Sequence, residues 1–467
     1  MSAFRWTSAA VAEALRVPSP AGAPEAFGAV STDTRHVPVG ALFVALVGER
    51  FDGHRFLGAA ADAGAAGAVV THIPADAPAG LAYWVVEDTR AALGRLARFR
   101  RHRLAGRVVG VAGSNGKTST KDLLRAVLGV HFRVHATEAN LNNQIGVPLT
   151  LLSAPDDAEA VVVEMGTNEP GEIRILTRIV EPDAGVITSI GEEHLEKLVD
   201  LDGVLREEIA LLEGIRGEGP VFVAEEPAAL PAAARERIDP LRVQTAGVGT
   251  DAELRPDGGA AGIEVLEDGS TRWRWRGFEV HLPLPGVHNV RNALLALGVA
   301  AEWGVPPGEA VAGIAAMPRP KLRGEWHRIG GTRVLADCYN ANPPGVAAAL
   351  ELLAAIPSSG RKIAVLGTMR ELGAQADLLH LRVAEVAAER VGRGIDRIVA
   401  TGAFARALEP MQPTLGDALL RCEDPAEAYH ALAPELRGDE TILLKASRGE
   451  ALERWLELMG GAPQPVH

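Results

Sequence analysis

Gly113-Ser-Asn-Gly-Lys-Thr-Ser119 is the stretch that decides the fold of this 467-residue chain. It follows the apolar run Arg107–Ala112 and opens a helical pattern over Lys117–Val130, so a glycine-rich turn joins a buried strand to a helix. Glycine permits a positive φ and a close backbone approach, and the N–H groups of such a turn, with the helix N-terminus, cradle phosphate oxygens. Lys117 would contact the outer phosphates and Thr118 would ligate Mg²⁺. The motif is a shortened form, G-x-x-G-K-T, because Val111 stands where the longer consensus has glycine. An ordinary strand-to-helix turn is the alternative, but the Lys-Thr pair in this context favours an ATP-dependent enzyme.

The pattern around this turn predicts an α/β protein of three domains. Ala160–Glu164 and Gly185–Ser189 read as further buried strands separated by helices, which favours a central, doubly wound parallel sheet. We expect residues 1–105 to form a smaller N-terminal α/β domain, 106–317 the central domain, and 318–467 a C-terminal, Rossmann-like α/β domain. Within the central domain, residues 240–282 carry Trp273 and Trp275 at period-2 spacing and are predicted to form antiparallel strands or hairpins. Further strands are predicted at Ala41–Val47, Ala68–Val70, Thr332–Asp337, Lys362–Leu366, Arg397–Ala400 and Thr441–Leu444, and helices at Phe56–Ala66, Thr89–Arg103 and His288–Trp303.

Composition narrows the function. A net charge of −13 argues against non-specific binding to nucleic acid or to anionic membranes. Two cysteines, Cys338 and Cys422, cannot build a disulfide framework, so we expect a cytoplasmic location. Met1–Val17 reads as an amphipathic helix rather than a signal peptide. The sequence has no run of about 18 apolar residues, so we predict no membrane span. We expect small-molecule substrates, no nucleic acid, and a monomer.

Two polar residues follow the predicted central strands. Glu164 closes the run AVVVE, at the strand end where ligands of parallel sheets bind, and is a candidate Mg²⁺ ligand. A carboxylate that caps a loop is the alternative. His194 follows the next strand and a short turn, and is a candidate second ligand, although a lone histidine near a strand end is more often structural.

Taken together, these residues resemble the Mur ligase family over nearly the whole chain. The similarity lies in Ser31–Arg35, Asp52–Phe56, Gly113–Ser119, Asn140–Pro148, Glu164–Gly166, His194–Glu196, His288–Asn292, Asp337–Pro343, Leu366–Gly373, His380 and Lys445–Arg448. The resemblance implies ATP and Mg²⁺ as cofactors, and it implies catalytic roles for Lys117, Glu164, His194 and Glu208. It assigns ATP to Gly113, Ser114, Asn115, Gly116, Lys117, Thr118, Ser119, Asn289, Asn292, Arg323 and Asp337. It assigns the substrates to Ser31, Thr32, Arg35, Asn140, Asn142, Asn143, Tyr339, Asn340 and Asn342. A surface role for Arg35 and a plain helix-face role for Asn292 are the alternatives.

One departure from the family is chemical. Mur ligases carry a carbamylated lysine, a metal-binding anion, in the helix after the His-Leu-Glu segment. Here Glu208 stands at that position, and no lysine lies between Lys197 and Lys321. A glutamate supplies the same negative charge and the oxygen ligands that Mg²⁺ prefers. We therefore expect Glu208, or its neighbour Glu207, to replace the carbamate, so that the metal ligands are Thr118, Glu164, His194 and Glu208. A solvated Glu-Glu pair on a helix is the alternative.

The resemblance implies ATP-driven amide formation through an acyl phosphate. The string Asp337–Pro343 favours the family member that joins D-alanyl-D-alanine to UDP-N-acetylmuramoyl-tripeptide, a step of peptidoglycan synthesis. The alternatives are a ligase that adds a free amino acid to the UDP-N-acetylmuramoyl-dipeptide, or one similar to folylpolyglutamate synthetase. The third residue of the tripeptide, meso-diaminopimelate or L-lysine, stays open.

Overall fold

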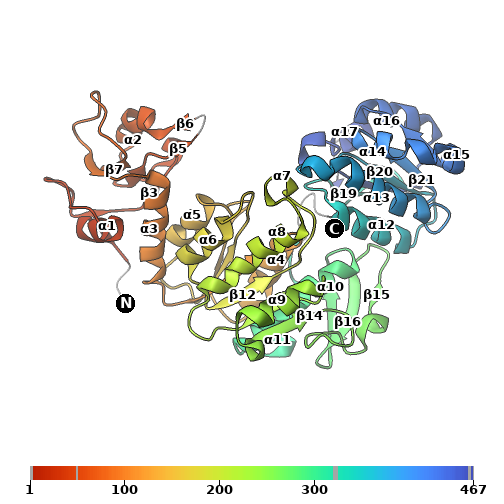
Figure 1. Cartoon of the computed structure of the whole chain (residues 1–467), viewed down its shortest axis with the longest axis horizontal. Coiled ribbons are helices and arrows are strands. Elements are labelled where there is room, and N and C mark those ends of the chain that lie inside the picture. Colours follow the sequence, from red (N-terminus) through yellow and green to blue (C-terminus); the bar gives the residue numbers. More distant parts are fainter. Residues whose placement is uncertain (1–3, 49–50, 319–323, 461–463, 466–467) are drawn as a thin grey trace.

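A computed structural model describes residues 4–48, 51–318, 324–460 and 464–465. Three α/β units follow one another along the chain, and the central one lies between the other two (Figure 1). This is the predicted fold class, with parallel sheets in all three units. Among the described residues, none of the helices has the length and apolar character that crossing a bilayer requires.

The N-terminal unit is built on a parallel sheet in the order β3-β4-β7-β8, with two short antiparallel pairs, β1-β2 and β5-β6, beside it. Of the predicted strand Ala41–Val47, only Leu42–Val44 forms a strand in this sheet, and all three of these residues are buried. The elements are β1 (Trp6–Thr7), α1 (Ser8–Leu15), β2 (Ala26–Phe27), β3 (Val30–Ser31), β4 (Leu42–Val44), β5 (Val47–Gly48), β6 (Phe51–Asp52), α2 (Leu57–Asp62), β7 (Gly67–Val70), β8 (Ala82–Val85) and α3 (Thr89–Arg101).

Helix α3 closes the N-terminal unit but is fastened to the central one. Its buried Arg101 donates from Nε to the carbonyl of Val180 at 2.8 Å and pairs through Nη2 with Asp183 at 2.8 Å. Arg100, also buried, donates to the carbonyl of Ala154 at 2.7 Å. The last turn of α3 therefore belongs physically to the central unit.

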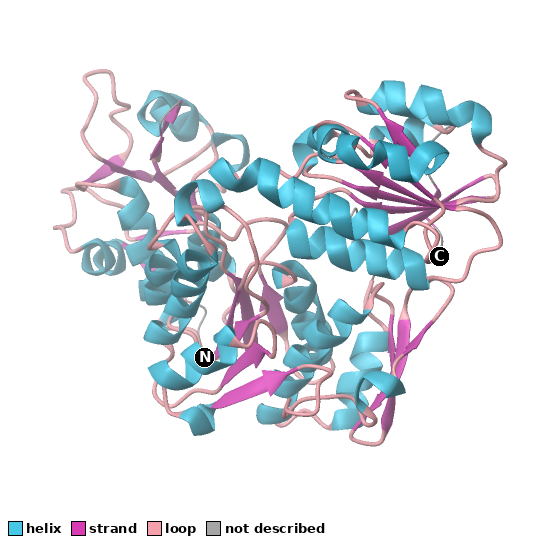
Figure 2. Cartoon of the chain, turned by 45° about the vertical axis from the view of Figure 1, so that its right-hand side comes forward, coloured by secondary structure: helices cyan, strands magenta, loops and turns pink. Residues whose placement is uncertain are grey.

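The central unit holds the predicted parallel sheet, in the order β10-β11-β9-β12-β13-β14 among the described residues. Strand β9 lies inside it, and its side chains alternate between two apolar clusters, Val109 and Val111 facing one, Val108 and Ala112 the other. Helices cover both faces (Figure 2). The elements are β9 (Arg107–Ala112), α4 (Lys117–Gly129), β10 (Val134–Ala136), α5 (Gly146–Ser153), β11 (Ala160–Glu164), α6 (Glu172–Val180), β12 (Ala184–Ile187), α7 (Leu195–Leu198), α8 (Leu201–Glu208), β13 (Val221–Ala224), α9 (Ala229–Arg237), β14 (Val243–Ala246), β15 (Glu264–Val265), β16 (Thr271–Trp275), β17 (Phe278–Leu282), α10 (Val287–Glu302) and α11 (Pro307–Ala315).

The prediction for residues 240–282 was wrong at its start. Strand β14 joins the parallel sheet beside β13 rather than an antiparallel hairpin. Strands β15, β16 and β17 do form the expected antiparallel sheet, and Trp273 and Trp275 are buried on one face of β16, as their period-2 spacing indicates.

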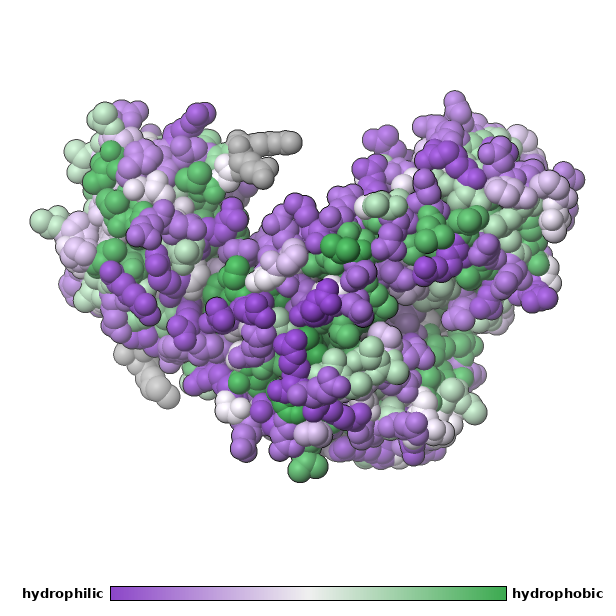
Figure 3. All heavy atoms as spheres, in the orientation of Figure 1, coloured by the Kyte–Doolittle hydropathy of each residue, from purple (hydrophilic) through white to green (hydrophobic). Residues whose placement is uncertain are grey.

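The third unit is a mixed sheet in the order β22-β21-β20-β23-β19-β18-β24 within the described residues. Its parallel core contains the four strands that were predicted, and β18 and β24 run antiparallel at one edge. The elements are β18 (Glu325–Ile329), β19 (Thr332–Asp337), α12 (Pro343–Ala355), β20 (Lys362–Leu366), α13 (Ala376–Arg390), β21 (Arg397–Ala400), α14 (Ala403–Ala407), α15 (Gln412–Leu415), β22 (Leu419–Arg421), α16 (Pro425–Leu432), β23 (Thr441–Lys445), α17 (Arg454–Leu458) and β24 (Gln464–Pro465). In the space-filling view a broad notch separates the N-terminal and third units (Figure 3).

Candidate active site

The glycine-rich turn joins β9 to α4 and is tied to the end of β12. Gly113 and Gly116 have φ of 118° and 84°, values that favour glycine. A Cβ on Gly113 would lie 2.4 Å from Oγ1 of Thr188, which itself donates to the carbonyl of Asn115 at 2.6 Å. The backbone N–H of Ser114 donates to the carbonyl of Ser189 at 2.9 Å. The N–H groups of Gly113, Ser114 and Asn115 are thus bonded within the protein and hold the turn in place. The first residues of α4 line a cavity on the other side, where a helix N-terminus favours an anion.

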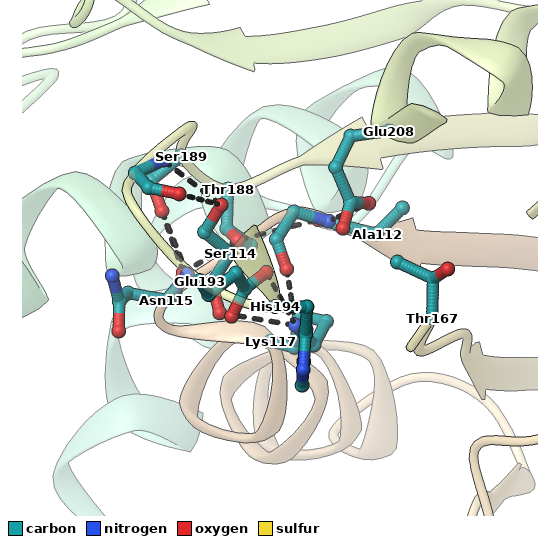
Figure 4. Close-up of polar contacts among 12 residues, drawn as sticks. Ala112, Ser114, Asn115, Lys117, Thr167, Thr188, Ser189, Glu193, His194 and Glu208 are labelled. Atoms are coloured by element: carbon teal, nitrogen blue, oxygen red, sulfur yellow. Dashed lines mark hydrogen bonds and ion pairs between the residues drawn. The ribbon is translucent and has the colours of Figure 1, made fainter. Parts of the chain in front are cut away.

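Lys117 lies at the first position of α4. Its ammonium group donates to the carbonyls of Gly113 and Ser114 and lies 3.7 Å from Oε1 of Glu193. Glu193 is almost fully buried, and its Oε1 has no hydrogen-bond partner. Glu193 was not among the predicted site residues, although its position directly before His194 was a signal. Figure 4 shows the side chains of Lys117, Glu193 and His194 gathered beside the turn.

Thr118, Asn142 and Glu164 form a second polar group at the end of β11. Oε1 of Glu164 accepts from Oγ1 of Thr118 at 3.2 Å and from Nδ2 of Asn142 at 3.0 Å. Its other oxygen, Oε2, is buried and has no partner. A hydroxyl and a carboxylate with an unused buried oxygen are a donor set that suits a hard divalent cation.

The neighbouring residues Glu207 and Glu208 are both buried but serve different segments. Glu207 accepts from the backbone N–H groups of Gly171 at 2.6 Å and Ile173 at 2.8 Å, so it holds the loop after β11. Glu208 accepts from the N–H of Gly113 at 2.6 Å, and its Oε1 is buried without a partner. Burial raises the pKa of Glu208 to about 7, against the opposing charge of Lys117. Glu208 lies behind the turn and does not line the cavity.

His194 meets the third unit directly. Its Nδ1 lies 2.7 Å from Oε2 of Glu371, a residue of the loop between β20 and α13. Burial disfavours the charged imidazole, but the hydrogen bond to Glu371 and the carboxylate of Glu193 outweigh it and raise the pKa of His194. No role was predicted for Glu371, although it lies within Leu366–Gly373, one of the segments that resemble the family.

Helix α10 brings two predicted ATP contacts to the turn. Asn292 donates from Nδ2 to Oδ1 of Asn289 at 3.0 Å, and both side chains are buried. A Cβ on Gly116 would lie 2.7 Å from the amide oxygen of Asn292, so α10 touches the turn itself.

The third unit contributes the opposite wall. Lys445 Nζ, at the end of β23, pairs with Asp337 Oδ2 at 2.8 Å and donates to the carbonyl of Asn340 at 2.8 Å. Asn342 caps α12 and also donates from Nδ2 to Oδ1 of Asn115 at 2.9 Å, which links this unit to the turn.

These walls enclose a cavity of about 470 Å³. The predicted residues that line it are Ser114, Asn115, Gly116, Lys117, Thr118, Ser119, Asn140, Asn142, Glu164, His194, Asn289, Asn292, Asp337, Tyr339 and Asn340. Within the described residues, no three histidine, cysteine, aspartate or glutamate side chains gather closely enough to hold a metal by themselves. A cation here would thus share its coordination with phosphate oxygens and water, as Mg²⁺ commonly does.

Other predicted site residues lie elsewhere. Ser31, Thr32 and Arg35 belong to the N-terminal unit and do not line this cavity; the exposed Arg35 pairs with Asp33 at 2.6 Å. Asn143 accepts from the N–H groups of Ile145 and Gly146 at the start of α5. Arg323 lies outside the described residues.

A phosphate-binding turn on a parallel sheet, whose cavity a second α/β unit closes, defines a nucleotide-binding protein of the phosphate-loop class. Three family models match successive parts of the chain: Mur ligase family, catalytic domain (residues 27–101), Mur ligase middle domain (111–300), and Mur ligase, glutamate ligase domain (322–448). The chain belongs to the Mur ligase family.

Individual relatives span almost the whole chain. The UDP-N-acetylmuramoyl-tripeptide--D-alanyl-D-alanine ligase of Bacillus subtilis (strain 168) is 34% identical over 432 residues, 91% of each chain. A crystal structure of MurF from Acinetobacter baumannii is 30% identical, with a TM-score of 0.86, and the match covers 99% of this chain and 100% of that one. A MurF ligase from Thermotoga maritima, solved in complex with ADP, is 26% identical with a TM-score of 0.76, over 92% of this chain and 96% of that one.

Proposed function

We infer that this chain is the ATP-dependent ligase that joins D-alanyl-D-alanine to UDP-N-acetylmuramoyl-tripeptide and so completes the pentapeptide nucleotide of peptidoglycan synthesis. The observation that best supports this chemistry is a cavity that is lined by residues of both the phosphate turn and the third unit. The relatives carry the choice of substrates, because they are similar to this chain over nine-tenths of its length.

The reaction first has to bring two anions together. The terminal carboxylate of the tripeptide attacks the γ-phosphate of ATP, giving an acyl phosphate and ADP. The amine of D-alanyl-D-alanine then attacks the acyl carbon, and phosphate leaves. Lys117 and the N–H groups at the start of α4 stabilise the charge on the transferring phosphate, and the buried setting strengthens these interactions. Asn289, Asn292 and Asp337 are proposed to hold the nucleotide, as is Arg323.

The residues present fit a first Mg²⁺. Thr118 and Glu164 would hold it, and the unpartnered Oε2 of Glu164 supports this assignment. When bound, Mg²⁺ would neutralise phosphate charge and polarise the phosphoryl group. For a second cation we propose His194 and Glu208, with Glu208 as the carboxylate that stands in for a carbamylated lysine. Its unpartnered buried oxygen supports this role, and a bound cation would favour the ionised carboxylate over the neutral form that burial favours.

We assign residues 1–105 to binding of the uridine nucleotide, 106–317 to ATP, and 318–467 to completion of the ATP and D-alanyl-D-alanine site. Ser31, Thr32 and Arg35 would contact the nucleotide substrate, with Asn140, Asn142 and Asn143 on its peptide arm. Tyr339, Asn340 and Asn342 would contact D-alanyl-D-alanine. A cytoplasmic, monomeric enzyme is the accompanying proposal.

The test is phosphate release from ATP in the presence of Mg²⁺ and UDP-N-acetylmuramoyl-tripeptide, with and without D-alanyl-D-alanine. We expect release that requires both substrates, with the pentapeptide nucleotide detected by mass spectrometry. The tripeptide is supplied in two forms, with meso-diaminopimelate or L-lysine as third residue. The assignment would be overturned if phosphate were released instead with UDP-N-acetylmuramoyl-dipeptide and a free amino acid as substrates, or with folate and glutamate.

A further inference from the structure

Two non-glycine residues with left-handed backbone face each other across the boundary between the central and third units. His194 has φ of 51° and Glu371 has φ of 65°, and their side chains meet at 2.7 Å. A left-handed backbone is strained for a residue other than glycine and is kept only where the surroundings enforce it. Such positions cluster at functional sites.

The loop that carries Glu371 is fixed on both sides of this residue. The N–H of Met369 donates to Nε2 of His380 at 2.9 Å, and the N–H of Arg370 donates to Oγ of Ser447 at 3.0 Å. Leu372, which follows Glu371, is buried. Contacts within the third unit therefore fix the backbone that directs the Glu371 carboxylate toward His194, although the Glu371 side chain itself is largely exposed.

His194 has two ring nitrogens, and Glu371 occupies only one of them. The Nδ1 atom is the partner of the carboxylate, while the residue lines the nucleotide cavity. The hydrogen bond at one ring nitrogen decides the tautomer, and hence what the other nitrogen offers. A carboxylate on Nδ1–H leaves the lone pair of the neutral ring on Nε2 and fixes the orientation of the ring.

We propose that Glu371 is a positioning residue for His194: it holds Nδ1–H and so presents Nε2 to the nucleotide cavity. The proposal rests on the proposed function, in which His194 is a ligand of a second cation in the nucleotide cavity. Since the carboxylate comes from the third unit, His194 is correctly set only when that unit is docked on the central one.

The same boundary offers a matched control. Glu192 pairs with Arg382 of α13 at 2.9 Å, so it is also an ion pair between the two units, but it does not involve His194. Glu192→Gln removes the ionic part of a docking contact alone, since the amide oxygen can still accept from Arg382. Glu371→Ala removes the partner of Nδ1, and Glu371→Gln keeps an oxygen that can accept from Nδ1–H. Thermal unfolding checks that all three variants fold.

Steady-state phosphate release separates positioning from docking. We expect Glu371→Ala to lower kcat about 10- to 100-fold with the KM for ATP changed less than about 2-fold, the size of effect seen for residues that orient a ligand histidine. Glu371→Gln should recover most of this loss, and Glu192→Gln should stay close to wild type. Equal kcat values for Glu371→Ala and Glu192→Gln would overturn the proposal.

A spectroscopic measurement needs neither substrate nor metal. Two-bond ¹H–¹⁵N spectra of ¹⁵N-histidine-labelled protein, at about pH 9 and so above the ordinary histidine pKa of about 6.5, report which ring nitrogen carries the proton. His194→Gln identifies the signal. We expect protonated Nδ1 in wild type and Glu192→Gln, and loss of that state in Glu371→Ala. If the wild type released no phosphate, the proposed function would fail, whereas an unchanged His194 signal in Glu371→Ala would reject the positioning role itself.

Discussion

At the scale of single residues, Glu207 and Glu208 show how adjacent carboxylates on one short helix take on separate tasks. Glu208 bonds the phosphate turn and Glu207 bonds the loop after β11. We predict that Glu208→Gln lowers kcat about 10- to 100-fold, because the amide keeps the bond to Gly113 but loses the negative charge near Lys117. Added bicarbonate should not restore the rate, since no lysine is available to be carbamylated. Phosphate release with and without bicarbonate measures both points.

Glu207→Gln is the control for that experiment. Its amide group would face backbone N–H donors that a carboxylate satisfies, so we expect a loss of about 1–3 kcal/mol of stability with little change in kcat. Full activity in Glu208→Gln, or a larger kcat loss in Glu207→Gln, would contradict the division of tasks. Denaturant unfolding followed by circular dichroism gives the stability change.

Glu440 in the third unit provides a pH-dependent prediction. Burial favours its neutral form, but the N–H groups of Arg437 and Gly438, with the guanidinium of Arg361, outweigh burial and hold the pKa of Glu440 below its usual value. A lowered folded pKa means that the stabilisation is present above the unfolded pKa of about 4.3 and is lost as the pH falls through the folded value. Glu440→Gln should lower Tm at neutral pH, and the gap to wild type should narrow in acid. A gap that widens in acid would refute this assignment.

At the scale of elements, what the sequence predicts depends on whether a pattern is local. β9, β11, β19, β20 and β21 have the predicted bounds, because each is an apolar run buried on both faces and closed by turn residues. The place of β14 in the sheet was predicted wrongly, because the order of strands depends on long-range pairing that its four residues do not encode. The role of Glu371 was not predicted for a related reason, since it depends on a contact with His194, which lies on another unit.

Helix α10 allows a test of how closely a helix must pack against its neighbours for its side chains to contact ATP. A Cβ on Gly298 would lie 2.4 Å from Leu254 Cδ1 and 2.8 Å from Phe222 Cδ1. We predict that Gly298→Ala destabilises the protein by about 1–3 kcal/mol through overpacking, and weakens ATP binding as Asn289 and Asn292 move with the helix. Calorimetric titration with ATP and thermal unfolding measure the two effects.

The matched control is Gly58→Ala in α2, where an added Cβ meets nothing within 4 Å. There the substitution should leave ATP affinity unchanged and stabilise the helix by about 0.5–1 kcal/mol. Unchanged ATP affinity in Gly298→Ala would show that α10 tolerates displacement.

At the scale of the whole molecule, docking of the third unit on the phosphate turn is a matter of close fit. A Cβ on Gly191 would lie 2.8 Å from Cγ of Pro344, at the start of α12. We predict that Gly191→Ala holds the third unit away and lowers kcat about 10- to 100-fold, as small misplacements do, with an increase in the radius of gyration in solution scattering. Gly129→Ala, where nothing lies within 4 Å, is the control. A compact, fully active Gly191→Ala variant would contradict this account.

The fastening of α3 has a consequence for how the chain is made. The helix is complete at Arg101, but the groups that neutralise its buried arginines, around Ala154 and Val180–Asp183, come later in the sequence. During synthesis the ribosome releases the N-terminal unit before these partners exist, and domains generally fold from the N-terminus as they emerge. The apolar side of α3 can pack in the core of the first unit at once, but its last turn leaves the exit tunnel without partners for Arg100 and Arg101. Folding of the first unit is therefore finished only when the central unit has been made as far as Asp183.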